Sequence, residues 1–233
     1  MNRLSDAHHF RKQVAGICML VAPALLLAGV IFHPETSTSE SSMVAAAAGD
    51  PDAWYWAHAL VFASLVLAVP ATLGFMHMLR EREAAWGHVG GGLALLGILA
   101  FIGIVTVEGF VGWQAATGDP AEMTALLQRL FDSDGFGMLF GVASFGYVLG
   151  VASLAMGLYR ARATQSYFAL FLIMGATLLT ISASTASELV AVVGAAFILV
   201  GSGMIGRTVL LETDEEWEHT PEYTGFRSLA GMR

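Results

Sequence analysis

The chain has 233 residues, of which 56% are hydrophobic and only 13% are charged. Soluble domains carry about 25% charged residues, so this composition excludes an ordinary soluble domain and indicates a surface that faces lipid. The net charge is −8, and the sequence has no basic patch of the kind that nucleic-acid binding requires. A single cysteine, Cys18, excludes an intramolecular disulfide.

Six apolar segments are each long enough to cross a bilayer, since a membrane helix needs about 20 residues. They cover residues 14–32, 54–79, 88–113, 136–159, 167–184 and 187–211. We therefore predict an all-α integral membrane protein, a bundle of six transmembrane helices that forms one domain over residues 1–211. Residues 212–233 are rich in acidic residues, and such a run predicts a solvated cytoplasmic tail.

The Lys and Arg residues lie almost entirely on one side of the predicted bundle. Ten of the eleven precede the first segment, follow the second or the fourth, or lie at and after the end of the sixth. Only Arg129 falls on the other side. Because the cytoplasmic loops of membrane proteins are enriched in Lys and Arg, this pattern predicts a multi-pass protein of the bacterial inner membrane with both termini in the cytoplasm.

The connections on the outer side contain two similar helix starts. Gly49-Asp50-Pro51 and Gly118-Asp119-Pro120 each offer an Asp as the N-cap and a proline as the first helical residue. The second start is followed by apolar residues at helical spacing, namely Met123, Leu126, Leu127, Leu130 and Phe131. This pattern predicts an amphipathic helix that lies flat at the membrane interface, either as a connector or as a lid over a site.

Three ionisable residues lie in the outer half of the predicted membrane helices: His58, Glu108 and Glu188. Such residues are costly in a bilayer and are candidates for function. His58 and Glu108 lie at nearly the same depth, because the second and third segments run antiparallel around a short turn. Small residues share the helix faces of both glutamates, which predicts that the carboxylates face the bundle. We expect these three residues to form a ligand or proton site.

Each candidate also has a purely structural interpretation. His58 lies beside residues 54–56, which are typical of an interfacial aromatic belt. Glu108 could be a carboxylate that snorkels to the interface, and His33 could be an ordinary loop residue. The pattern Thr185-x-x-Glu188 is that of a capping box, in which the glutamate only satisfies a helix start.

Two cofactors fit the titratable residues of the chain. His33, His58 and Glu108 could bind a divalent metal such as zinc or iron, since imidazole and carboxylate are common ligands. Alternatively, His77 and His88 on the cytoplasmic side could hold one haem b between membrane helices. The sequence has no metalloprotease, hydrolase or phosphate-loop motif, which argues against a hydrolase or a nucleotide-driven pump.

Small residues on the fourth segment predict how it packs. Its stripe consists of Gly146, Gly150, Ser153 and Gly157. Small residues let helix backbones approach closely in a membrane, so the stripe predicts a helix contact inside the bundle or, alternatively, the interface of a homo-oligomer.

Three functions fit the sequence best, and an intramembrane enzyme is a less favoured fourth. The first is a membrane module that binds a small ligand or a metal at an outward-facing His/Glu site. The second is a proton-coupled transporter of a small solute that uses the same residues. The third is a structural or accessory subunit of a larger membrane complex.

Overall fold

The fold is entirely helical over residues 3–115 and 117–219, which are the residues described by the computed structural model. Among them, six helices are long and apolar enough to span a membrane. These are α1 (Arg3–Phe32), α3 (Pro51–Met78), α4 (Ala84–Thr106), α7 (Asp134–Arg160), α8 (Ser166–Thr185) and α9 (Glu188–Leu211). They correspond to the six predicted segments, except that α1 begins well before residue 14. α4 continues through a turn of π-helix, η1 (Val107–Val111), into α5 (Gly112–Ala115).

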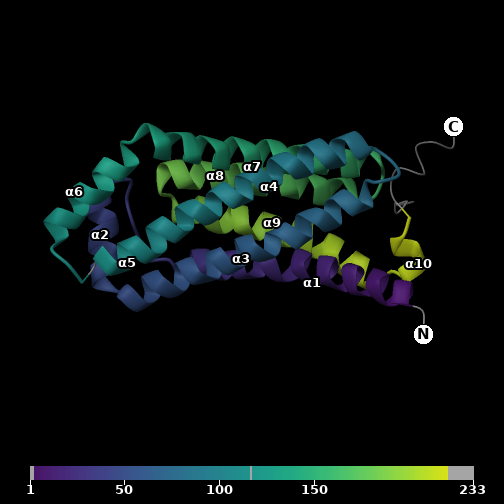
Figure 1. The fold of residues 1–233 in the computed structure, drawn as a ribbon, viewed down its shortest axis with the longest axis horizontal. Coiled ribbons are helices and arrows are strands. Elements are labelled where there is room, and N and C mark those ends of the chain that lie inside the picture. Colours follow the sequence, from purple (N-terminus) through teal and green to yellow (C-terminus); the bar gives the residue numbers. More distant parts are fainter. Residues whose placement is uncertain (1–2, 116, 220–233) are drawn as a thin grey trace.

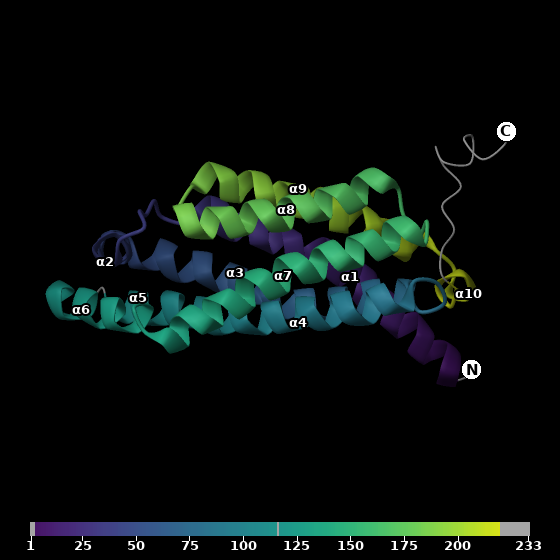
Figure 2. The same ribbon diagram turned by 90° about the horizontal axis from the view of Figure 1, so that it is seen from above.

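The six long helices form a closed ring. Each packs against two neighbours, in the order α1, α3, α4, α7, α8, α9 and back to α1. Figure 1 shows α2 (Glu40–Gly49), α5 and α6 (Pro120–Phe131) at one end of the molecule and α10 (Asp214–Trp217) at the other. We call these the α6 end and the α10 end. In Figure 2 the turn between α8 and α9 stops short of α2 and α6.

The helices at the α6 end begin at the residues that cap them. The Asp50 side chain accepts a hydrogen bond from the Ala53 amide at the start of α3. Asp119 does the same for the Ala121 amide at the start of α6. Both predicted helix starts are therefore confirmed, whereas the location of α6 at a membrane interface stays a prediction. α2 was not predicted, although Ser39 caps it and an alanine run favours a helix.

Glycines bring α4 and α7 into backbone contact. A Cβ atom on Gly146 would lie 3.1 Å from the Gly97 nitrogen, and one on Gly90 would lie 2.8 Å from the Leu154 nitrogen. The small stripe of α7 therefore contacts α4 within the chain, in agreement with the first of its two interpretations. A homo-oligomer through the same stripe stays a prediction.

The hydrophobic core fills mainly the half of the ring near the α10 end. Its fully buried members there include Met78, Leu79, Leu158 and Val209. Large side chains from neighbouring helices meet in this half, so it is closely packed. The opposite half holds the cavity described below.

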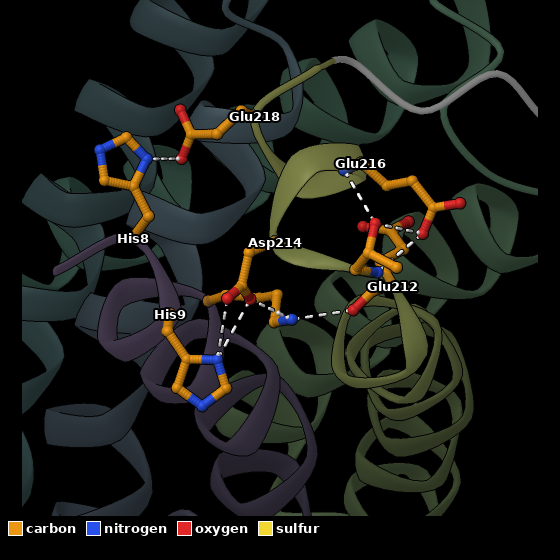
Figure 3. Close-up of polar contacts among 8 residues, drawn as sticks. His8, His9, Glu212, Asp214, Glu216 and Glu218 are labelled. Carbon is orange, nitrogen blue, oxygen red and sulfur yellow. Dashed lines mark hydrogen bonds and ion pairs between the residues drawn. The ribbon is translucent and has the colours of Figure 1, made fainter. Parts of the chain in front are cut away.

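An ion pair holds the C-terminal segment against the α10 end of the ring. Asp214 accepts a hydrogen bond from His9 Nδ1 at 3.1 Å and pairs with Lys12 Nζ at 2.5 Å. Lys12 is only 4% exposed and also donates to the Glu212 carbonyl oxygen at 2.8 Å. Figure 3 shows His9 of α1 and Asp214 of α10 pointing toward one another.

Trp217 reinforces this contact. Its buried ring stacks on His77 with the ring centres 4.5 Å apart, and its carbonyl accepts a hydrogen bond from Arg80 Nη2 at 3.0 Å. His8 also pairs with Glu218 at 2.5 Å. Residues 212–219 are thus docked on the ring, a contact that the sequence did not predict, while their assignment to a solvated cytoplasmic tail stays a prediction. The rest of the predicted tail, 220–233, lies outside the described residues.

Asp214→Asn is expected to loosen the docked segment. The hydrogen bonds from Lys12 and then from His9 hold the pKa of Asp214 below its ordinary value. The ionised carboxylate therefore stabilises docking above that ordinary pKa, and this contribution is lost as the pH falls through the lowered pKa. Amide hydrogen exchange of residues 213–219 at neutral pH should be faster in the variant. Glu215→Gln, on an exposed side chain of the same helix, is the control. Equal exchange in both variants would contradict the role of the ion pair.

Candidate functional site

At the α6 end the ring encloses a cavity of about 610 Å³. All six long helices contribute to its wall, together with η1, α6 and the connections that join α1 to α2 and α8 to α9. Most of the lining side chains are aliphatic or aromatic, among them Phe101, Phe136 and Phe140. Sites for small ligands have volumes of about 300–1,000 Å³ and mostly apolar walls. The cavity therefore has the size and the lining of a small-molecule site.

The four titratable residues predicted for the outer half all line this cavity. They are His33 at the end of α1, His58 on α3, Glu108 in η1 and Glu188 at the start of α9. The structure thus brings together, from four separate segments, the His58 and Glu108 side chains that the sequence placed at one depth and the two further candidates, His33 and Glu188. Their role as a ligand or proton site stays a prediction.

Two imidazoles present acceptor atoms in this wall. His58 donates its Nδ1 hydrogen to the Trp54 carbonyl, and His33 donates its Nδ1 hydrogen to the Pro34 carbonyl, each at 2.8 Å. Because a carbonyl can only accept, Nδ1 carries the proton in both rings, and in a neutral ring Nε2 is then an acceptor. Burial lowers the pKa of His33, partly offset by its bond to Pro34, which favours the neutral ring. The two ring centres are 5.0 Å apart.

The π-helical turn η1 positions Glu108. Trp54 Nε1 donates a hydrogen bond to the backbone oxygen of Glu108 at 3.1 Å, and the Trp54 side chain is only 1% exposed. The same ring packs on His33 and His58, with centres 5.1 and 4.6 Å away. Turns of π-helix occur frequently at functional sites. This turn could not be predicted from the sequence, because its partner Trp54 lies on another helix.

Two glycines allow η1 and α5 to approach α3 at this point. A Cβ atom on Gly109 would lie 2.6 Å from the Cβ of His58. A Cβ atom on Gly112 would lie 2.9 Å from Trp54 Nε1. Neither position has room for a larger residue unless α3 moves away, so the glycines fix the distance between Glu108 and the imidazoles.

The two carboxylates have few partners. Among the residues that the structure describes, none donates a hydrogen bond to the Glu108 carboxylate. Within the same set, Glu188 Oε1 is buried and has no hydrogen-bond partner. Buried acceptors without donors are uncommon in folded proteins and call for an explanation, such as a bound group.

The capping box expected for Thr185 and Glu188 does not form. The Thr185 hydroxyl instead donates to the Ile181 carbonyl at 2.9 Å, within the last turn of α8. Ala186 then adopts the left-handed conformation (φ 49°), which separates the two helices, and α9 begins after Ser187. This interpretation of Glu188 is therefore wrong, and its side chain is left to face the cavity.

The metal and haem hypotheses receive less support from the geometry. Within residues 3–115 and 117–219, no three His, Cys, Asp or Glu side chains are grouped closely enough to hold a metal ion. His33, His58 and Glu108 therefore share a cavity without forming a metal cluster. At the other end, the Nε2 atom of His77 lies 3.1 Å from the Trp217 carbonyl, and His88 is exposed. A haem bound by His77 would have to displace Trp217.

Comparison of the chain with protein-family models, curated proteins and solved structures finds no match. The cavity and its four titratable residues are therefore the basis for a functional conclusion.

Proposed function

We propose that this chain is a multi-pass membrane protein that binds a small ligand in the cavity at its α6 end. His33, His58, Glu108 and Glu188 are the polar contacts of the proposed site. The observation that carries the proposal is their convergence from four elements on one largely apolar cavity. Ligand sites combine an apolar wall with a few placed polar groups, and ionisable residues are retained inside membranes mainly where they serve a function.

Insertion in a membrane is supported by the outer surface of the ring. Large apolar side chains are exposed on all six long helices; examples are Ile31, Leu73, Leu99, Phe145, Leu170 and Leu189. A continuous apolar surface of this kind is rare on soluble monomers and suits contact with lipid. We therefore place the ring across the bilayer.

The charge difference between the two ends supports one orientation. The described basic residues at the α10 end are Arg3, Arg11, Lys12, Arg80, Arg82, Arg160, Arg162 and Arg207, and among the described residues the α6 end carries only Arg129. By the positive-inside rule we place the α10 end in the cytoplasm. In a bacterial inner membrane the cavity then lies on the periplasmic side, with α6 at the outer interface.

Binding of Nile red, a neutral environment-sensitive dye, tests the cavity. The protein is placed in phosphatidylcholine nanodiscs, and we expect a saturable fluorescence component above the lipid background. Ala191 lines the cavity one turn beyond Glu188, so Ala191→Phe should fill it and weaken saturable binding by about tenfold or more, equivalent to 1.4 kcal/mol.

Leu189→Phe provides the matched control. Leu189 lies two residues away on the same helix, is 75% exposed and is not part of the cavity wall. This variant should bind the dye like the wild type. A wild type without a saturable component, or an Ala191→Phe variant that binds as the wild type does, would contradict the proposal and favour a structural or accessory subunit.

A further inference from the structure

The charged groups of the cavity are all of one sign. Glu108 and Glu188 line it, and no Lys or Arg is among the described residues of its wall. The buried Glu188 Oε1 atom also has no donor within the described chain. A ligand that supplied a positive charge would provide the missing partner for these oxygens, whereas an anion would be buried beside carboxylates without a counter-ion.

The neutral polar groups of the wall also favour a positively charged ligand. Both imidazoles use their Nδ1 hydrogens on backbone carbonyls, so His33 and His58 can offer Nε2 only as an acceptor while they are neutral. The hydroxyl of Ser182 is likewise committed as a donor, to the Leu179 carbonyl. These three side chains therefore offer the ligand acceptor atoms and no free donor hydrogen.

Aromatic rings form much of the remaining wall. Those that line the cavity are Trp54, Phe101, Phe131, Phe136, Phe140 and Tyr147. The faces of aromatic rings attract organic cations, and several rings around one site are a common way to bind a quaternary ammonium group. An apolar wall of this kind also favours a ligand with a hydrophobic body.

The connections around the cavity add a long-range negative electrostatic field. The two outer connections, residues 33–53 and 114–135, contain eight acidic residues and one basic residue, Arg129. The acidic residues are Glu35, Glu40, Asp50, Asp52, Asp119, Glu122, Asp132 and Asp134. Such a field raises the local concentration of cations and lowers that of anions at the α6 end.

We infer that the ligand of this cavity is a lipophilic organic cation, with its positive charge at Glu108 and Glu188 and its hydrophobic body against the aromatic wall. This inference rests on the binding function proposed above. It narrows that function to one class of ligand, and neutral dyes enter the cavity only because its wall is apolar.

Two ions of matched size and shape and opposite charge test the inference. Tetraphenylphosphonium and tetraphenylborate are titrated against bound Nile red in phosphatidylcholine nanodiscs, with the signal of Ala191→Phe subtracted for lipid partitioning. The cation should displace the dye at a concentration at least about tenfold lower than the anion, as expected for one charge-assisted contact. The cation's advantage is the ratio of the concentrations at which the anion and the cation displace the dye. Glu108→Gln and Glu188→Gln should each lower this ratio about tenfold, because each variant loses one charge-assisted contact. Glu215→Gln, on an exposed glutamate of α10 at the opposite end of the molecule, should leave the cation's advantage unchanged.

The outcomes separate the two proposals. Equal displacement of bound Nile red by the two ions, or stronger displacement by the borate, would overturn the inference and leave the binding function intact. The comparison of the two ions in the wild type decides this even where a glutamine variant fails to fold. Absence of saturable Nile red binding in the wild type would instead overturn the proposed function itself.

Discussion

Gly150→Ala is expected to destabilise the protein by about 1–3 kcal/mol, the cost of overpacking a closely packed interior. A Cβ atom at this position would overlap the backbone nitrogen of Ala94 and lie 2.6 Å from its Cα atom. Backbone atoms of a packed helix cannot rotate away as the end of a flexible side chain can. The variant therefore has to separate α4 from α7, which pack closely along their length. Thermal unfolding in detergent measures the effect.

Gly141→Ala is the matched control for this prediction. Gly141 lies on the same helix, and a Cβ atom there would meet nothing within 4 Å. Both substitutions gain the helix propensity of alanine over glycine, up to about 1 kcal/mol, so any difference between them reports the contact with α4. Gly141→Ala should be neutral or stabilising, and equal melting temperatures for the two variants would refute close packing at Gly150.

Trp54→Ala is expected to cost about 3–5 kcal/mol, the range for removing a large buried aromatic side chain. Trp54 is almost fully buried, packs on both cavity histidines and donates to the Glu108 carbonyl. Its loss would remove the partner of η1 and enlarge the cavity, so we expect lower stability together with weaker Nile red binding. Trp54→Phe should keep most of the packing and lose only the hydrogen bond, at about 1–3 kcal/mol for a buried acceptor left without a donor.

Trp56→Ala is the comparison for Trp54→Ala. Trp56 lies two residues further along α3 and is 61% exposed. Its ring has an edge-to-face contact with Tyr55, and substitutions at such exposed positions usually change stability by much less than the loss of a buried aromatic side chain. Similar unfolding temperatures for the two alanine variants would show that the packing around η1 contributes little.

The sequence predicted the six long helices because each depends on the length of one apolar segment. It predicted the starts of α3 and α6 because the side chains of Asp50 and Asp119 cap backbone amides that follow shortly after them in the chain. The pairing of His58 with Glu108 followed from the short connection between antiparallel helices, and the structure places both beside one cavity. Each of these inferences uses information that is local in the chain.

Two of the three features that the sequence did not predict depend on residues far apart in the chain. The docking of Asp214 needs His9, which is 205 positions away, so an acidic run read by itself indicated a solvated tail. The π-helical turn needs the indole of Trp54 on a different helix. At Thr185 and Glu188 the spacing suggested a cap, but the left-handed Ala186 assigns the two residues to separate helices. Tertiary partners decided the first two cases, and the local backbone conformation at Ala186 decided the third.

Closure of the ring has a consequence for the order in which the molecule is built. α1 emerges first during synthesis, yet it packs against α9, the last long helix, and Ser202 of α9 donates to the Met19 carbonyl across 183 residues. Contacts between distant segments form late, because the chain between them has to be ordered first. One side of α1 therefore stays uncovered until α9 has been made, and only then can the cavity wall be complete.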